Sequence, residues 1–189
     1  MKKILSGFVI MAICSGLNQT IAQYVPSYSG MFNAGLFYGS NKSKAQVQTI
    51  HGVAYKGWFA GLGGGIDDYF QQSIPVFLDV RKNILNKEST PFIYVDGGLN
   101  IVTKGTEENW GKTKMESGQF YEGGVGYKVS LNGKIALNFA AGYSAKTHEV
   151  KTYQKRTIPT PPYILSEWIL GNTEKYELQR FVMKVGLQF

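Results

Sequence analysis

The residues that could support catalysis lie around the second histidine of the chain. The sequence contains two histidines, His51 and His148, and His148 has Ser144, Thr147 and Glu149 close by. A catalytic base must lie within hydrogen-bond reach of its nucleophile. Ser144 and His148 would follow one another along a single strand, so we do not expect them to form such a pair. We therefore expect no enzyme activity, and we predict that His148 faces solvent.

Two other patterns could suggest a cofactor or a metal ion. Residues 61–66 look like a dinucleotide-binding loop, but the third glycine of G-x-G-x-x-G would fall on Ile66, and no helix follows. Asp67 and Asp68 could hold a cation, but no further spaced acids accompany them, so we interpret them as a solvated turn. The only cysteine is Cys14, which excludes a disulfide framework and a thiolate zinc site. We expect no cofactor and no metal.

The first 22 residues have the layout of a secretory signal peptide. They begin with two lysines, continue with a mostly apolar run and end with small side chains. The apolar run falls short of the roughly 20 residues that a membrane-spanning helix needs. A lipoprotein signal that uses Cys14 is a variant of the same export prediction. We predict a cleaved signal at residues 1–22 and one domain at residues 23–189.

The charge of the chain gives little reason to expect a nucleic-acid partner. The formal net charge is +7, and it falls to +5 without the two lysines of the signal segment. These charges are dispersed, and the chain is predicted to be exported, so we exclude nucleic acid as a partner. After the signal segment no stretch approaches 18 consecutive apolar residues, so no later helix is expected to span a membrane.

Apolar and polar residues alternate with a period of two through most of the remaining chain, which is the pattern of β-strands. The alternating segments exceed the roughly 5–6 residues typical of strands in soluble proteins. They match the roughly 9–11 residues that a tilted strand needs to cross a bilayer. We predict eight strands, at residues 29–39, 45–55, 57–66, 74–85, 91–103, 117–129, 134–145 and 176–189.

The connections between the predicted strands are alternately short and long. Three of them are tight turns, and one contains Asn132-Gly133, which is a hairpin signal. The others are longer, and the last covers about residues 146–175. Short turns at one end and long loops at the other are typical of a transmembrane β-barrel.

The facing of the strands follows from the lack of water in a bilayer. A sheet can cross hydrocarbon only when it closes, and its apolar face must then look outward. We therefore predict an all-β, eight-stranded antiparallel up-and-down transmembrane β-barrel. Side chains fill the interior of so small a barrel, so we expect the polar ones to block flow rather than line a pore, with inner glycines leaving room for them. The predicted inner polar network is Asp79, Arg81, Asp96, Glu122, Lys128, Arg180 and Lys184.

The last residues of the chain, FVMKVGLQF, carry an apolar side chain at every second position: Phe181, Met183, Val185, Leu187 and Phe189. Three other informative segments are WFAGLGGGID (58–67), SIPVFLDVRKNIL (73–85) and PFIYVDGGLNI (91–101). Together they resemble the small Gram-negative outer-membrane β-barrel family, of the eight-stranded porin-like or OmpA-like kind. The resemblance covers the whole chain after the signal segment.

This resemblance implies a location in the outer membrane, in contact with its lipid and lipopolysaccharide. It also implies that the terminal alternation acts both as the closing strand and as the signal that the barrel-assembly machinery reads during insertion. Nothing follows Phe189 in the sequence, so the C-terminal peptidoglycan-binding domain of longer members is not expected.

The last long connection is the best candidate for a specific partner. Its basic residues are Lys146, His148, Lys151, Lys155 and Arg156. At the outer surface, such a loop could bind the phosphates of lipopolysaccharide or an external ligand.

We accordingly expect an integral outer-membrane barrel with a structural or surface-interaction role. Three alternatives remain open. One is a narrow channel for small solutes, and another is a lipid A-modifying enzyme, since some barrel enzymes of this size use a histidine, a serine and an acid at the outer rim. The third is a soluble periplasmic barrel, which would carry its apolar residues inside.

Overall fold

The structure is a computed structural model, and it describes residues 25–39, 43–68, 72–102, 106–107, 111–160 and 163–189. The predicted signal segment at 1–22 lies outside these residues. Within them, no helix is long and apolar enough to cross a membrane. The strands are β1 (Ser27–Tyr38), β2 (Lys44–Tyr55), β3 (Trp58–Asp68), β4 (Gln72–Asn83), β5 (Thr90–Val102), β6 (Thr106–Glu107), β7 (Gly111–Glu116), β8 (Gly118–Ser130), β9 (Ala136–Thr160) and β10 (Tyr163–Gln188).

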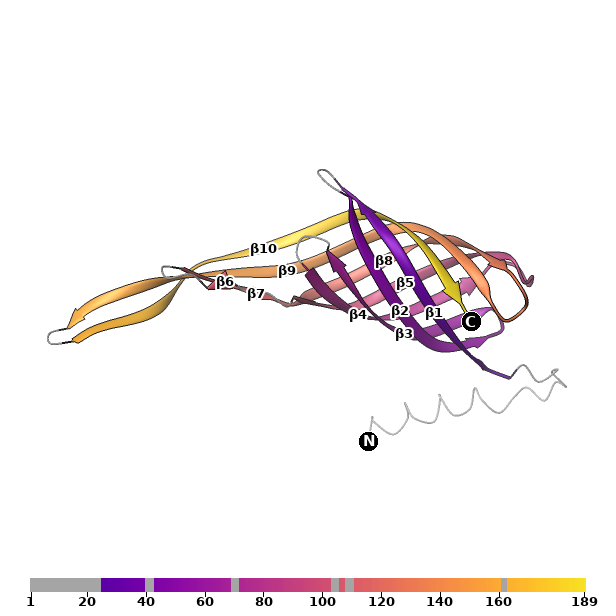
Figure 1. Ribbon diagram of the computed structural model, residues 1–189, viewed down its shortest axis with the longest axis horizontal. Coiled ribbons are helices and arrows are strands. Elements are labelled where there is room, and N and C mark those ends of the chain that lie inside the picture. The colour runs from indigo at the N-terminus through magenta and orange to yellow at the C-terminus, as the bar shows by residue number, and fades with distance from the viewer. Residues whose placement is uncertain (1–24, 40–42, 69–71, 103–105, 108–110, 161–162) are drawn as a thin grey trace, which may run out of the picture.

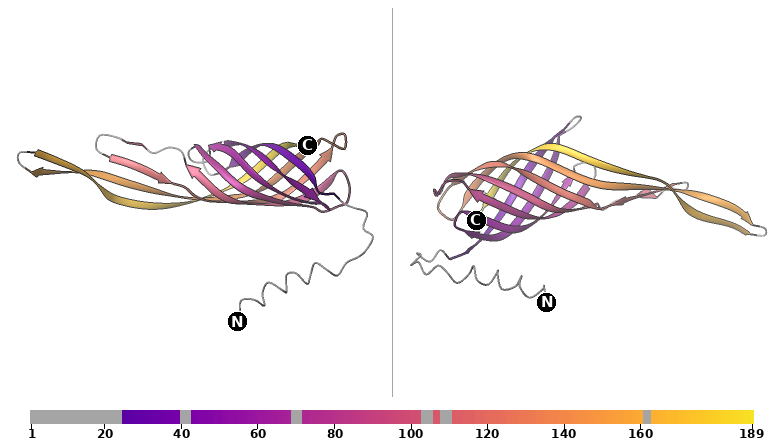
Figure 2. Two further views of the ribbon diagram at one scale, coloured as in Figure 1. Left: turned by 90° about the horizontal axis from the view of Figure 1, so that it is seen from below. Right: turned by 180° about the vertical axis from the view of Figure 1, so that it is seen from behind.

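Eight of these strands form a closed antiparallel ring (Figures 1 and 2). Their order is β10-β1-β2-β3-β4-β5-β8-β9, and β9 pairs with β10 to complete the ring. The final strand therefore joins both ends of the sheet, with Gln188 opposite Met31 of β1 on one side and Ala136 of β9 on the other. This arrangement confirms the predicted eight-stranded antiparallel up-and-down barrel.

The facing of the strands follows the period-two pattern. In β4, Val76, Leu78 and Val80 are 44%, 60% and 44% exposed, whereas Phe77 and Asp79 between them are buried. The same alternation places large apolar side chains on the outer surface of every strand of the ring. The prediction that the apolar face looks outward is confirmed, and this outer band argues against the soluble periplasmic barrel.

Two of the tight turns adopt the backbone conformations that short hairpins require. Lys56 and Gly57 both have positive φ, at 48° and 75°, as in the type I′ turn that matches strand twist. Gly133 has φ of 72°, and the side-chain oxygen of Asn132 accepts hydrogen bonds from the backbone amides of Lys134 and Ile135. These turns and the C-terminus lie at one end of the barrel, which we call the short-turn end (Figure 1).

The predicted loop at residues 146–175 is wrong, because the described residues of this range continue the strands instead. β9 and β10 stay paired up to Tyr163 opposite Thr160, with one register shift between Leu170 and Asn172. β7 pairs with the other edge of β9, and β6 pairs with β7. We call this projection beyond the ring the blade: the described residues of 106–116, 147–160 and 163–177 (Figures 1 and 2). At about 3.3 Å per residue, its β10 portion spans roughly 50 Å.

The inner glycines accommodate both kinds of side chain: a Cβ at Gly35 would collide with Lys184, as expected for the long charged residues, whereas others leave room for aromatic rings. A Cβ at Gly63 would collide with the ring of Phe77, and one at Gly126 would collide with Phe92. The Phe77 ring also packs against Phe120, with ring centroids 5.2 Å apart. The interior therefore contains an apolar cluster of Met31, Ile50, Phe59, Phe77 and Phe120 beside its charged residues.

Two adjacent glycines of β3 provide a matched test of this packing. Gly63→Ala should lower the free energy of unfolding by about 1–3 kcal/mol, because the Phe77 ring has no room to move. Gly64→Ala should be neutral or slightly stabilising, since only the carbonyl oxygen of Pro75 comes within 3.9 Å of the added methyl group. Urea unfolding in lipid vesicles measures both, and equal losses in the two variants would contradict the packing.

Candidate functional site

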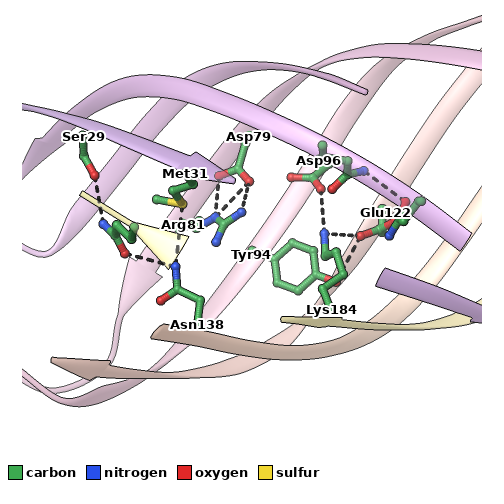
Figure 3. Close-up of polar contacts among 12 residues, drawn as sticks. Ser29, Met31, Asp79, Arg81, Tyr94, Asp96, Glu122, Asn138 and Lys184 are labelled. Atoms are coloured by element: carbon green, nitrogen blue, oxygen red, sulfur yellow. Dashed lines mark hydrogen bonds and ion pairs between the residues drawn. The ribbon is translucent and has the colours of Figure 1, made fainter. Parts of the chain in front are cut away.

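The centre of the barrel contains a compact charged layer (Figure 3). Three carboxylates lie on neighbouring strands at paired positions: Asp79 of β4 is opposite Asp96 of β5, and Asp96 is opposite Glu122 of β8. Arg81 donates three hydrogen bonds of 2.7–2.9 Å to Asp79. Lys184 of β10 reaches across the lumen to Glu122 and lies 3.5 Å from Asp96. Each of these five side chains is at most 6% exposed.

The side chain of Tyr94 contacts one acid and both cations of this layer. Tyr94 donates a hydrogen bond of 3.2 Å to Glu122, and the ammonium of Lys184 lies 4.3 Å from the centre of its ring. The guanidinium of Arg81 lies 5.7 Å from the same ring and 5.5 Å from that of Phe92. Side chains from β4, β5, β8 and β10 thus meet across the lumen. Tyr94 is not among the site residues that the sequence predicts, although its period-two position in β5 places it on the inner face.

The other two residues of the predicted inner network lie outside this layer. Lys128 is half-buried at the short-turn end, and no carboxylate of the described residues lies within ion-pair distance of it. Arg180 is half-buried near the opposite end, where its side chain approaches Gly39. The structure therefore brings five of the seven residues together and leaves these two near the ends of the barrel.

A second buried ion pair corrects two predictions. Lys146, expected in an outer loop, lies inside the barrel and contacts Asp67, while its ammonium is 3.3 Å from the side-chain oxygen of Asn100. Asp67, expected in a solvated turn, is buried and accepts a 2.7 Å hydrogen bond from Ser73. The cause is the continuation of β9, which keeps Lys146 on the same inner face as Ser144.

His148 is also placed differently from the prediction. It faces inward on β9 and is buried, with only 5% of its surface exposed, and its ring stacks on Tyr176 at 5.2 Å with an interplanar angle of 9°. Burial lowers the pKa of His148 below its usual 6.5, so the ring is neutral at pH 7. It is therefore not a solvent-facing rim residue.

The remaining basic residues of the predicted outer loop divide between the two faces of the blade. Lys151 and Lys155 have the same parity as Tyr143, whose side chain lies on the outer surface of the ring. Arg156 has the opposite parity and lies on the other face. Lys151 forms a partly exposed ion pair of 2.8 Å with Glu116 of β7. The register gives this outward face further members: Lys112, Lys114, Tyr153, Trp168 and Leu170.

The C-terminal alternation lies on the outer surface of the barrel. The side chains of Phe181, Met183, Val185, Leu187 and Phe189 are all between 47% and 67% exposed. The backbone of Phe189 exchanges two hydrogen bonds with Gly30, of 2.8 and 2.9 Å. Among the described residues, no group of three or more His, Cys, Asp or Glu side chains could hold a metal ion.

A buried and an exposed ion pair allow the central layer to be tested. Lys184→Met should lower the free energy of unfolding by about 3–5 kcal/mol, because it leaves Asp96 and Glu122 buried without their cation. Lys44→Met removes the exposed Lys44–Asp68 pair of 2.6 Å and should cost less than about 1 kcal/mol. Urea unfolding in vesicles compares the two, and a small effect at Lys184 would mean that solvent reaches the central layer.

This chain is similar to known proteins in its structure but not in its sequence. No protein-family model matches the sequence, and no curated protein matches it. The structure is similar to the outer membrane protein AlkL, solved in lipid bilayers, with 14% identity and a TM-score of 0.51 over 92% of this chain and 94% of that one.

Two further solved structures resemble it. Neisserial surface protein A matches at 12% identity and a TM-score of 0.47, over 87% of this chain and 97% of that one. OprG of Pseudomonas aeruginosa matches at 11% identity and a TM-score of 0.44, over 85% of this chain and 94% of that one. With its closed ring of eight strands and its likeness to AlkL, this chain has the fold of the small outer-membrane β-barrels.

Proposed function

We propose that this protein is an integral outer-membrane barrel that holds the blade above the outer surface, where the outward face of the blade binds the anionic groups of lipopolysaccharide. One observation carries the proposal: β9 and β10 run from the barrel wall into the blade without interruption. The face of β9 and β10 that contacts lipid within the ring therefore continues into the blade. There its side chains lie next to the headgroup layer of the same membrane.

The outer surface of the ring supports the membrane location. Its strands expose valine, leucine, isoleucine and phenylalanine side chains in a continuous band, while the central charges are buried. A closed ring also leaves no unpaired sheet edge in hydrocarbon, where each unsatisfied backbone group would cost several kcal/mol. We assign the short-turn end to the periplasm and the blade to the exterior, as is usual in such barrels.

The outward face of the blade supports the choice of ligand. Its strands β7 and β9 carry Lys112, Lys114, Lys151 and Lys155 with the same facing, and these four lysines outnumber the two acids beside them, Glu116 and Glu149. Tyr153 and Trp168 lie among these lysines, and an aromatic ring beside a cation suits the boundary between apolar and charged groups. A cluster of this kind attracts phosphate, and its strength should fall with added salt.

The charged layer favours an anchor over a channel. Arg81, Lys184 and Tyr94 extend across the lumen between the carboxylates and are buried in doing so. A solute would have to break these contacts to pass. A narrow channel is the alternative function, and discrete conductance steps in planar bilayers would favour it over our proposal.

The remaining alternatives have less support. An enzyme acting on lipid A would need a nucleophile and a base exposed to lipid at the outer rim, whereas Ser144 and His148 are buried on the inner face of β9. For the last strand, we propose that its outward apolar residues are the signal read by the assembly machinery. Their exposure on the ring exterior leaves them accessible to such a partner.

The membrane orientation can be tested with single cysteines, after Cys14 has been replaced by serine. Gln154→Cys on the exposed blade should react in intact cells with a maleimide that cannot cross the outer membrane. Lys134→Cys, exposed at the short-turn end, should react only after the cells are broken. Labelling in the reverse order would overturn the assigned orientation.

The ligand can be tested with two double variants of equal charge. Lys151→Gln with Lys155→Gln should weaken binding of purified lipopolysaccharide by roughly 10- to 30-fold, at about 1 kcal/mol per lysine near an anionic surface. Lys87→Gln with Lys134→Gln, in the short turns, should leave binding within twofold. The protein is immobilised in nanodiscs free of lipopolysaccharide, and binding is measured at two salt concentrations. Equal binding by dephosphorylated lipopolysaccharide would contradict the proposal.

A further inference from the structure

A cavity lies between the charged layer and the short-turn end of the barrel. Its volume is about 220 Å³. The lining combines the segment that leads into β1, the turn between β2 and β3, and inward-facing side chains of several strands. The lining residues used below are Met31, Phe59, Arg81, Phe92, Lys128 and Asn138.

The charged layer ends this cavity on the side toward the blade. Arg81 lines the cavity and is fixed there by its three hydrogen bonds to Asp79. Phe92 packs beside the guanidinium of Arg81, and both side chains are buried. The cavity is therefore a dead end that a ligand would enter from the short-turn side.

Two lysines line the cavity besides Arg81: Lys56 is exposed in the turn between β2 and β3, and Lys128 is half-buried. Arg81 is neutralised by Asp79, whereas no carboxylate of the described residues lies within ion-pair distance of Lys128. The exposed Glu88 acts on it only from a greater distance. The cavity thus has one half-buried cation without an adjacent anion, which suits a ligand that carries a single negative charge.

A second, independent observation comes from Asn138, which is 3% exposed. Its amide nitrogen donates to the side-chain oxygen of Gln188 at 3.2 Å and contacts the sulfur of Met31 at 3.9 Å. Its amide oxygen is fully buried without a hydrogen-bond partner, so Asn138 presents to the cavity no accessible acceptor that would repel an anion.

The other walls are apolar. Met31, Phe59 and Phe92 line the cavity and are each at most 5% exposed. A ligand that fills the space must therefore present an apolar body to these walls and its charge to Lys128. Inorganic phosphate satisfies only the second condition.

We propose that this cavity is a binding site for a small monocarboxylate with an apolar body, entering from the periplasmic side. The carboxylate pairs with Lys128, and the apolar body packs against Phe59 and Phe92. The site is separated from the blade by the charged layer, so its occupation does not depend on whether the blade binds lipopolysaccharide.

The test uses the full-length protein in nanodiscs of zwitterionic lipid, with benzoate and hexanoate as ligands. NMR titration should show saturable shifts of the amide signals of Met31, Phe92 and Asn138 at millimolar concentrations. Benzyl alcohol, which has a similar body without the charge, and inorganic phosphate at matched ionic strength should each bind at least fivefold more weakly.

Two variants with the same change of charge complete the test. Lys128→Met should weaken benzoate binding at least fivefold, whereas Lys134→Met, in the exposed turn outside the cavity lining, should leave it within twofold. Migration on an unboiled gel verifies that each variant is folded. An absence of saturable shifts would show that the cavity holds water only, and equal weakening by both variants would show non-specific attraction. Either result would overturn the proposal.

Discussion

The closure of the sheet by β10 is the constraint on which the rest of this structure depends. Hydrocarbon offers no partner to a backbone N–H or C=O group, so a strand crosses it only when both of its edges are paired. β10 pairs with β1 over Met31–Gln188 to Tyr38–Phe181, and with β9 along its other edge. Once the ring is closed, the outward residues must be apolar, and every charge in the spanning region must be accommodated inside.

The barrel interior accommodates its charged side chains in a small cluster surrounded by aromatic side chains. Three carboxylates on adjacent strands would repel one another. Arg81 pairs with Asp79, and Lys184 is shared between Asp96 and Glu122, so two cations face three acids. Taking such groups out of water is costly, and the attraction between them repays that cost only when the geometry is good and further hydrogen bonds are made. Tyr94 supplies one of these hydrogen bonds and a face for both cations. The aromatic side chains fill the space that a narrow ring would otherwise leave to water.

The sequence was sufficient to predict the strands and their facing, because both follow from the local period-two pattern. It also placed Asp79, Asp96 and Glu122 on inner faces. It could not show which cation meets which acid, since Lys184 and Asp96 are 88 residues apart and on strands that are not adjacent. Nor could it show where β9 leaves the membrane. The apolar alternation stops at Ala145, although the strand continues to Thr160. The pattern stops because the outward side chains no longer face lipid, and the sequence alone does not distinguish this from the end of a strand.

The continuity of β9 explains why its basic residues have different roles. The alternation of the side chains within the ring continues beyond it, so Lys146 and His148 stay on the inner side. Lys151 and Lys155 lie on the other side, which is the outer surface of the strand within the ring. Near the ring, the inner side is enclosed, so Lys146 needs Asp67 as a partner. Farther out, neither side is enclosed, so charged side chains on both faces stay in contact with water and need no buried partner. The surroundings, and not the residue type, therefore decide whether a lysine of this strand is buried against an acid, as Lys146 is, or stays exposed, as Lys155 is.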